Sequence, residues 1–275
     1  MTPRTVIKYP GAKWSVAQWI ISVMPPHKSY LEPFFGSGAV FFCKPPSRIE
    51  TINDLDGEIV NLFTVIRDRA EELERAVALT PYSREVYDEA WEALRHQDPA
   101  GPVEQARRTL IRYWQGHGSR TIYKGGWKND LAGREYAYAV RYWNSLPAWI
   151  AGTVERLKEA QIEHTPAVEC IRRFRSPEVL IYADPPYLLS TRKQRQYRVE
   201  MEDAQHEELM KVLLDHPGPV MLSGYDSDMY NDMLRGWMQL RHEARCEYGG
   251  KRTECLWVNF EPQTSFECRS LDLSE

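Results

Sequence analysis

The sequence of 275 residues lacks any run of 18 apolar residues, which is the length that a membrane-spanning helix needs. The stretch after Met1 also lacks the apolar core of a secretory signal. Only five cysteines occur, an odd number, and none of them has the paired CxxC spacing of a zinc site. We therefore expect a cytoplasmic protein with reduced thiols, no metal and no membrane segment.

A general excess of positive charge is also missing, because 35 lysines and arginines face 39 acidic residues, for a net charge of −4. This balance argues against a wholly basic coat for nucleic acid, although it allows a local basic patch. The hydrophobic content of 43% and the charged content of 27% are typical of ordinary globular proteins. The length suffices for one large domain or two modest ones.

Short apolar stretches alternate with amphipathic stretches near both ends of the chain, which predicts an α/β fold. From about residue 63 to 160 the alternation stops and helical patterns dominate. We therefore predict one α/β domain made of residues 1–62 and 161–275, with a mainly helical domain of residues 63–160 inserted in it. One predicted strand ends at Glu32. The others cover residues 49–53, 161–164, 179–182, 220–223 and 254–260.

The most informative stretch is Asp184-Pro185-Pro186-Tyr187, directly after the predicted strand 179–182. The prolines cannot continue a central strand, so the chain turns at the carboxyl end of the sheet, where α/β proteins bind ligands. A carboxylate and a rigid carbonyl can accept both hydrogens of an exocyclic base amine and free its lone pair, while an aromatic ring stacks on the base. The alternative is a plain strand-to-loop turn, in which Asp and Pro are common.

Three other stretches suggest a ligand site. Tyr9 and Lys13 flank a Pro-Gly turn before a predicted helix, although a solvated lysine at a helix entry is the simpler interpretation. Glu32 ends a strand before a glycine-rich turn, and an acid there favours a ligand with a cation or hydroxyls over one with phosphates. Asp54 lies 18 residues after Gly36, close to the spacing of a ribose-binding acid, whereas we expect Asp56 to cap the next helix.

The centre of the insertion is basic and rich in aromatics and glycine. Between Glu104 and Arg141 there are eight positive and three negative side chains, a net charge of +5 in a protein of −4. This asymmetry favours a phosphate-binding surface over a solvated helix face. A second basic stretch, residues 190–198, suits a flap over the site, or else a disordered surface loop. The candidate residues for contact with a nucleic-acid backbone are Arg112, Arg120, Lys124, Lys128, Arg192 and Arg195.

Taken in order, these motifs resemble those of the Dam-like (α-group) adenine-N6 DNA methyltransferases nearly from end to end. The resemblance implies a Rossmann-like class I methyltransferase sheet, S-adenosylmethionine as cofactor, double-stranded DNA as substrate and a target-recognition role for the insertion. It implies that Tyr9 and Lys13 flank the methionine end of the cofactor and that Asp54 holds its ribose. The stretch that would line the rest of the cofactor site comprises Glu32, Phe34, Gly36, Ser37 and Gly38, together with Asp184.

By the same resemblance, Asp184 and the Pro185 carbonyl accept from the target amine, Pro186 stiffens the turn and Tyr187 stacks on a flipped-out adenine. The chain departs from the family at three positions. Tyr9 stands where tryptophan is usual, Ala12 stands where a second glycine is usual, and Pro166 stands where many members carry an acid near the cofactor adenine. The loop 116–130 does not resemble the recognition loop of the GATC-methylating members, so no recognition sequence is predicted.

The resulting hypothesis is site-specific transfer of a methyl group to adenine N6 in duplex DNA. The same tetrapeptide chemistry would also serve cytosine N4 or RNA adenine. A DNA-binding module with an inactive site is the third alternative.

Overall fold

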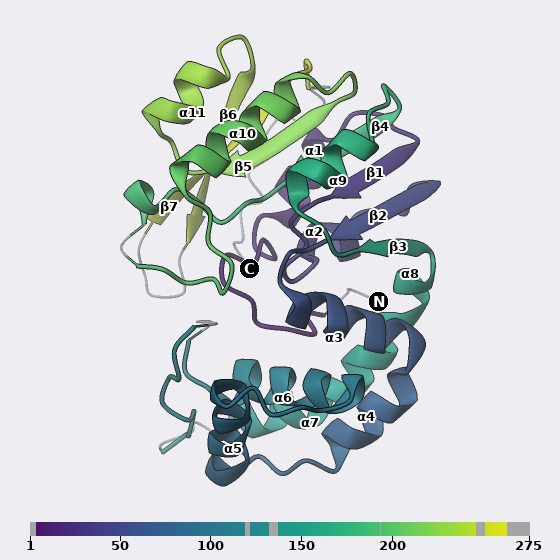
Figure 1. The fold of residues 1–275 in the computed structure, drawn as a ribbon, viewed down its shortest axis with the longest axis vertical. Helices are drawn as coiled ribbons and strands as arrows, with labels where there is room; N and C mark the ends of the chain where they lie inside the picture. Colours follow the sequence, from purple (N-terminus) through teal and green to yellow (C-terminus); the bar gives the residue numbers. More distant parts are fainter. Residues whose placement is uncertain (1–3, 119–121, 132–136, 193, 246–250, 263–275) are drawn as a thin grey trace, which may run out of the picture.

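A computed structural model describes residues 4–118, 122–131, 137–192, 194–245 and 251–262. Within these residues the strands form one seven-stranded sheet in the order β3-β2-β1-β4-β5-β7-β6 (Figure 1). The first five strands in the chain are mutually parallel, and β7 is antiparallel to both β5 and β6. The strands are β1 (Ser29–Glu32), β2 (Ile49–Asn53), β3 (Ala160–Glu163), β4 (Val179–Ala183), β5 (Val220–Gly224), β6 (Met238–Arg245) and β7 (Lys251–Val258).

Helices cover both faces of the sheet, as the α/β prediction requires. In β4, Leu180 and Tyr182 pack into one apolar cluster, whereas Val179, Ile181 and Ala183 pack into a second one. This alternation follows from the two-residue period of a strand, and it explains why β4 and β5 are buried along their whole length. The first cluster includes α1 (Ala17–Val23), α2 (Ala39–Cys43) and α3 (Gly57–Asp68), and the second includes α9 (Ala167–Arg173), α10 (Asp203–Leu214) and α11 (Asp228–Met233).

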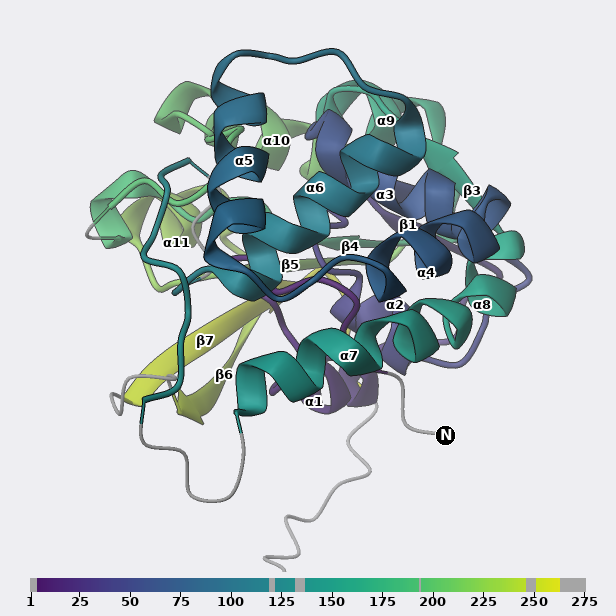
Figure 2. The same ribbon diagram turned by 90° about the horizontal axis from the view of Figure 1, so that it is seen from below.

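The remaining helices form a separate layer below the sheet in Figure 1 and in front of it in Figure 2. They are α4 (Ala70–Ala78), α5 (Arg84–Arg95), α6 (Pro102–Gln115), α7 (Tyr138–Ala151) and α8 (Val154–Lys158). Helix α6 is central, because it contacts α3, α4, α5 and α7. The chain enters this layer through α3, which continues without a break past the predicted domain boundary at residue 63.

The prediction missed β6 and placed the last strand too late, at residues 254–260. Strand β6 is the edge of the sheet, and its sequence alternates charged and apolar residues weakly. Edge strands often carry charges because these discourage pairing with other chains, so the usual apolar signal of a strand is weak there. The partner of β6 is β7, which begins at Lys251 rather than at Glu254.

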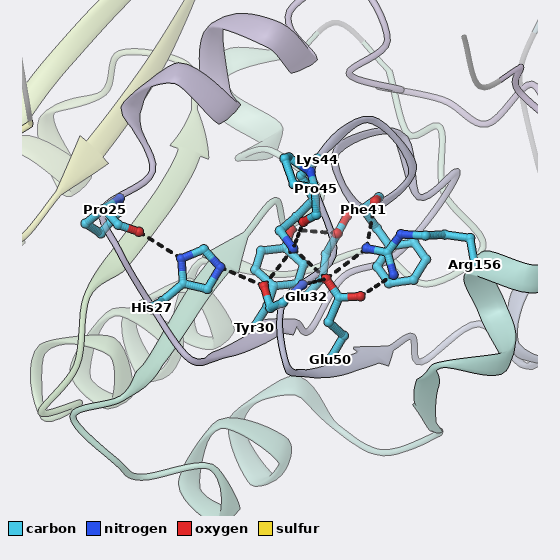
Figure 3. A network of polar contacts seen from close by, with 10 residues as sticks. Pro25, His27, Tyr30, Glu32, Phe41, Lys44, Pro45, Glu50 and Arg156 are labelled. Atoms are coloured by element: carbon cyan, nitrogen blue, oxygen red, sulfur yellow. Dashed lines mark hydrogen bonds and ion pairs between the residues drawn. The ribbon is translucent and has the colours of Figure 1, made fainter. Parts of the chain in front are cut away.

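A buried charge network joins the two layers at the end of the sheet opposite the carboxyl ends of β1 and β4 (Figure 3). Glu50 of β2 binds Lys44, with 2.5 Å between Nζ and Oε1, and Arg156 of α8, with 2.8 Å between Nη2 and Oε1. The Glu50 side chain is 1% exposed. Although burial alone would raise the pKa of Glu50, the hydrogen bonds from Arg156 and Lys44 hold it below its ordinary value. Glu50 therefore carries its charge inside the protein.

No helix in the described part of the chain is both long and apolar enough to cross a membrane. Cys43, Cys170 and Cys255 are free thiols, and Cys246 and Cys268 lie outside the described residues.

Candidate active site

The carboxyl ends of β1 and β4 meet at the point where the order of the strands reverses. The chain adds β2 and β3 on one side of β1, and then β4 and β5 on the other. Such a switch point leaves a crevice outside the strand ends, where α/β proteins bind ligands. A cavity opens there, with about 1120 Å³ of empty space including its mouth, which is room for a drug-sized ligand.

The cavity lies between the glycine-rich turn and the tetrapeptide that begins at Asp184. Of the residues predicted for the cofactor, all except Gly38 line it. Of the tetrapeptide, Asp184 and Pro186 line the cavity, whereas Pro185 and Tyr187 do not. The lining predicted from the sequence is Tyr9, Lys13, Glu32, Phe34, Gly36, Ser37, Asp54, Asp184 and Pro186.

Asp184 is mostly buried, with 17% of its side chain exposed, and forms an ion pair with Lys13, with 3.0 Å between Nζ and Oδ1. Lys13 also donates a hydrogen bond of 2.7 Å to the Gly11 carbonyl. Burial raises the pKa of Asp184 and the Lys13 ammonium opposes this rise. Burial disfavours the charge on Lys13, but Asp184 nevertheless holds its pKa above the ordinary value. Lys13 is therefore not the solvated helix-entry lysine of the simpler interpretation but the partner of the carboxylate.

Tyr187 is held from several sides. Its hydroxyl donates a 2.7 Å hydrogen bond to Oε2 of Glu254 in β7, and its ring packs edge to face on Tyr225 at 4.6 Å between centroids. Its carbonyl accepts a 2.6 Å hydrogen bond from Nε of Arg192. The sequence interpretation missed Glu254 as a site residue, because an isolated acid in a predicted strand carries no local signal.

The turn between β1 and α2 depends on two glycines in the left-handed region, Gly36 with φ +50° and Gly38 with φ +65°. A Cβ atom on Gly38 would lie 2.4 Å from the Phe35 ring, and one on Gly36 would lie 3.0 Å from the Tyr9 ring. Any larger residue would therefore strain the backbone and displace an aromatic ring.

Asp54 connects this turn to the start of α3. Its Oδ2 accepts a 2.8 Å hydrogen bond from the Gly36 amide, and its Oδ1 accepts one of 2.8 Å from the Asp56 amide. Burial raises the pKa of Asp54 to about 6, against the effect of these amides. Asp56 in turn accepts from the Glu58 amide at 3.0 Å, which confirms the prediction that it caps this helix.

Glu32 ends β1 as a buried acid, and its Oε2 accepts a 2.7 Å hydrogen bond from the hydroxyl of Tyr30. Burial raises its pKa from 4.5 to about 8, although the hydrogen bond from Tyr30 lowers it. Glu32 is therefore mostly neutral at pH 7 without a ligand, and a bound cation would favour its charged form.

The raised pKa of Glu32 predicts how a Glu32→Gln variant depends on pH. Between pH 4.5 and 8 the acid ionises in the unfolded chain but not in the folded one, so wild-type stability falls as pH rises. Glutamine has no proton to lose. Relative to wild type, we expect the free energy of unfolding of the variant to rise by up to about 1.4 kcal/mol for each pH unit in this window. Above the window, the difference should stay constant.

Urea unfolding of both proteins from pH 4 to 9 measures the difference between their free energies of unfolding. The contributions of all other titrating groups cancel in this difference. The exposed Glu178, whose partner is Lys28, gives a matched Glu178→Gln control for the loss of a surface carboxylate. A Glu32→Gln difference that stays constant with pH would contradict the raised pKa.

Two of the predicted DNA contacts do not fit the structure. The side chain of Arg112 is 4% exposed and binds Glu58, with 2.5 Å between Nη2 and Oε1. The side chain of Arg192 is 7% exposed and is occupied by Glu200 and the Tyr187 carbonyl. Both guanidinium groups are used inside the protein, so neither is available to a phosphate.

The other predicted DNA contacts remain accessible where they are described. Lys124 pairs with Asp88 of α5 at 2.9 Å between Nζ and Oδ1, and it is exposed. Lys128 is half-buried, beside the bridge between Gly116 and Trp127. The Arg195 side chain is 55% exposed and pairs with Glu202. Arg120 lies outside the described residues.

Among the described residues, no cluster of three or more histidine, cysteine, aspartate or glutamate side chains could hold a metal ion. Pro166 lies at the start of α9 and lines the cavity with Leu55 and Val168, so this part of the wall is apolar.

Comparisons with known proteins identify a family. The family model for the D12 class N6 adenine-specific DNA methyltransferases matches residues 9–247. The chain is 24% identical to the type II methyltransferase M1.LlaDCHI of Lactococcus lactis subsp. cremoris over 94% of this chain and 95% of that protein. It is also 24% identical to the DNA adenine methylase of Escherichia coli K12, over 86% of this chain and 84% of that protein.

A solved S-adenosylmethionine-dependent methyltransferase from Agrobacterium tumefaciens aligns with 89% of this chain and 59% of its own, at 10% identity and a TM-score of 0.35. This last likeness is too weak to support any conclusion. The family match spans both the glycine-rich turn and the tetrapeptide at Asp184, and on this evidence the chain belongs to the D12 class N6 adenine-specific DNA methyltransferases.

Proposed function

We propose that this S-adenosylmethionine-dependent enzyme methylates adenine N6 in duplex DNA, on a base flipped out of the helix, and that it works in the cytoplasm. The observation that carries the proposal is the position of Asp184, which lines the same cavity as the glycine-rich turn and Asp54. An acceptor for the target amine and a cradle for the methyl donor thus share one space. The free thiols of Cys170 and Cys255 suit a reducing compartment.

The lining of the cavity fits S-adenosylmethionine. Glu32 is a buried acid suited to an ammonium group, and Asp54 is suited to ribose hydroxyls. The apolar wall of Leu55, Pro166 and Val168 suits an adenine ring without an acidic partner. When bound, the cofactor supplies an electrophilic methyl group on a sulfonium centre, so no protein nucleophile is required.

Asp184 and the Pro185 carbonyl are the proposed acceptors for the two hydrogens of the adenine amine. Accepting both hydrogens favours a tetrahedral nitrogen with a free lone pair, and the prolines keep the acceptors in place during the reaction. Oδ1 of Asp184 faces Lys13, which leaves Oδ2 for the amine. Because burial alone favours the protonated acid, we assign Lys13 the role of keeping Asp184 ionised and able to accept.

The helical layer and the basic surface residues are proposed to hold the DNA. Lys124, Lys128, Arg195 and Arg120 would contact phosphates, and Tyr187 would stack on the flipped base. Flipping costs a few kcal/mol, of which stacking returns roughly 1–3 kcal/mol. We further propose the division into a catalytic domain, 1–62 and 161–275, and a target-recognition domain, 63–160.

Nucleoside mass spectrometry tests the proposed reaction. Duplex plasmid DNA from a host without adenine methylation is incubated with the protein and tritiated S-adenosylmethionine, then digested to nucleosides. We expect the label in N6-methyl-2′-deoxyadenosine from the DNA, and none when RNA is offered. Label in N4-methylcytosine, label in RNA alone, or no label would contradict the proposal.

A further inference from the structure

Two adjacent residues of α6, Arg112 and Tyr113, contact residues near the cavity. Both are buried, and neither lines the cavity. A segment that we call the strap, residues 194–201, borders this cavity, and Tyr197, Val199, Glu200 and Met201 of the strap line it. Tyr197 and Arg198 of the strap contact the same two residues as the α6 pair, namely Tyr9 and Glu58.

The first connection is electrostatic and runs through Glu58. Arg112 binds its Oε1 at 2.5 Å, and Nη1 of Arg198 lies 2.6 Å from its Oε2. Nε of Arg198 also lies 3.7 Å from Oδ1 of Asp56. Glu58 belongs to the first turn of α3, which follows directly on Asp54. One carboxylate thus ties α6 and the strap together at the proposed ribose-binding turn.

The second connection is aromatic and runs through Tyr9. The Tyr9 ring lies 6.0 Å from the ring of Tyr113 and 5.9 Å from the ring of Tyr197, measured between centroids. Tyr9 also packs on Gly36 of the glycine-rich turn, and Tyr197 packs against Gly11. The same two elements, α6 and the strap, therefore meet twice, once through Tyr9, which lines the cavity, and once through Glu58, four residues after Asp54.

The far end of the strap is anchored on the catalytic side. Glu200 accepts hydrogen bonds from the Gln196 and Tyr197 amides at 2.6 and 3.0 Å, and it also binds the buried Arg192. Arg192 in turn donates to the Tyr187 carbonyl. The strap thus spans from the proposed base-stacking residue to α3 and α6.

We propose that Glu58 and Tyr9 form a double clamp through which α6 holds the strap over the cofactor cavity, so that cofactor affinity depends on the helical domain. Arg112, Glu58 and Arg198 are positioning residues in this scheme, because they act through the strap and the Asp54 turn. The proposal rests on the proposed function, since it concerns the same cavity. It assigns to Arg112 a role in place of the DNA contact that the sequence suggested.

Calorimetric titration with S-adenosylhomocysteine, the demethylated form of the cofactor, tests the clamp on the full chain without DNA. The variants are Arg112→Met, Arg198→Met and the double variant, and each is first checked for folding by circular dichroism and thermal melting. We expect each single change to weaken binding about tenfold, and the double change to weaken it by far less than the product of the two, because coupled residues are not additive. Arg175→Met, which removes an equivalent arginine from an exposed pair with Asp215, should bind like wild type.

A second measurement adds duplex plasmid DNA to the same titrations. If DNA on the helical domain fixes α6, it should tighten wild-type binding by at least about fivefold, a typical coupling between sites. This factor should fall towards one in Arg198→Met. The Arg198 side chain is partly exposed, so its replacement disturbs the interior of the protein less than that of Arg112.

The outcomes separate the two proposals. Wild-type protein that binds no S-adenosylhomocysteine would overturn the proposed function and the clamp with it. Wild-type protein that binds and methylates, while Arg112→Met and Arg198→Met lower only the melting temperature and keep wild-type affinity, would overturn the clamp alone. A loss of affinity in the double variant that equals the product of the two single losses would show that the two arginines act independently. That result would also overturn the clamp.

Discussion

An Asp184→Ala variant is expected to lose about 100-fold to 10,000-fold in methylation rate, the range typical of a positioned proton acceptor. The carboxylate lies at the end of β4 and lines the cavity, where its Oδ2 is the proposed partner of the adenine amine. Alanine removes the acceptor and also leaves the buried Lys13 ammonium without its counter-ion. The rate is measured as tritium transfer from S-adenosylmethionine to duplex DNA at saturating cofactor.

An Asp184→Asn variant separates the charge of the side chain from its shape. Asparagine keeps the volume but presents an amide donor towards the amine, so we expect a loss of rate in the same range. It also leaves Lys13 without its counter-charge, so urea unfolding is measured beside the rate to show that the assayed protein is folded. Asp215→Ala serves as the control, because Asp215 is an exposed aspartate that pairs with Arg175 outside the cavity. Near-normal methylation by Asp184→Ala would rule out the mechanism.

A Glu50→Gln variant is expected to lower the free energy of unfolding by about 3–5 kcal/mol, because it leaves two buried cations without their counter-charge. Lys44 and Arg156 both bind Glu50, whose side chain is 1% exposed (Figure 3). Arg156 belongs to α8 and Glu50 to β2, so the loss would also loosen the contact between the helical layer and the sheet. Urea unfolding at pH 7 measures the change.

The exposed pair of Lys28 and Glu178 supplies the matched control for Glu50. Its side chains are 60% and 55% exposed, so Glu178→Gln should cost less than about 1 kcal/mol. Equal effects of the two substitutions would contradict the structural importance of the buried network.

Contacts local in sequence account for what was predicted well. The buried strand predicted at residues 179–182 and the cap at Asp56 follow from an apolar run and from a hydrogen bond within single elements, and both agree with the structure. The family resemblance rested on short motifs in order, and the family match covers those same motifs. By contrast, β6 escaped prediction, because an edge strand with charged side chains has a weak apolar pattern.

The errors at Arg112 and Arg192 have a different origin. A sequence shows that an arginine is present, but not whether an acid 54 residues earlier or eight residues later meets it in the fold. Buried acids attract guanidinium groups strongly, since an unpaired charge is costly in the interior. Composition therefore indicated a basic stretch between Glu104 and Arg141, whereas only the packing of α6 against α3 determined which of its charges face outward.

The sequence by itself determined the class of fold, the family and the residues that end β1 and β4, because each depends on short-range periodicity or on a compact motif. The tertiary structure alone determined that Lys13 neutralises Asp184, that Glu254 holds Tyr187 and that Glu58 joins α6 to the strap. Each of these pairs is brought together by the parallel sheet and its helical layer from distant parts of the chain. No local propensity encodes such pairs, because the burial and the close approach of their charged groups exist only in the folded state.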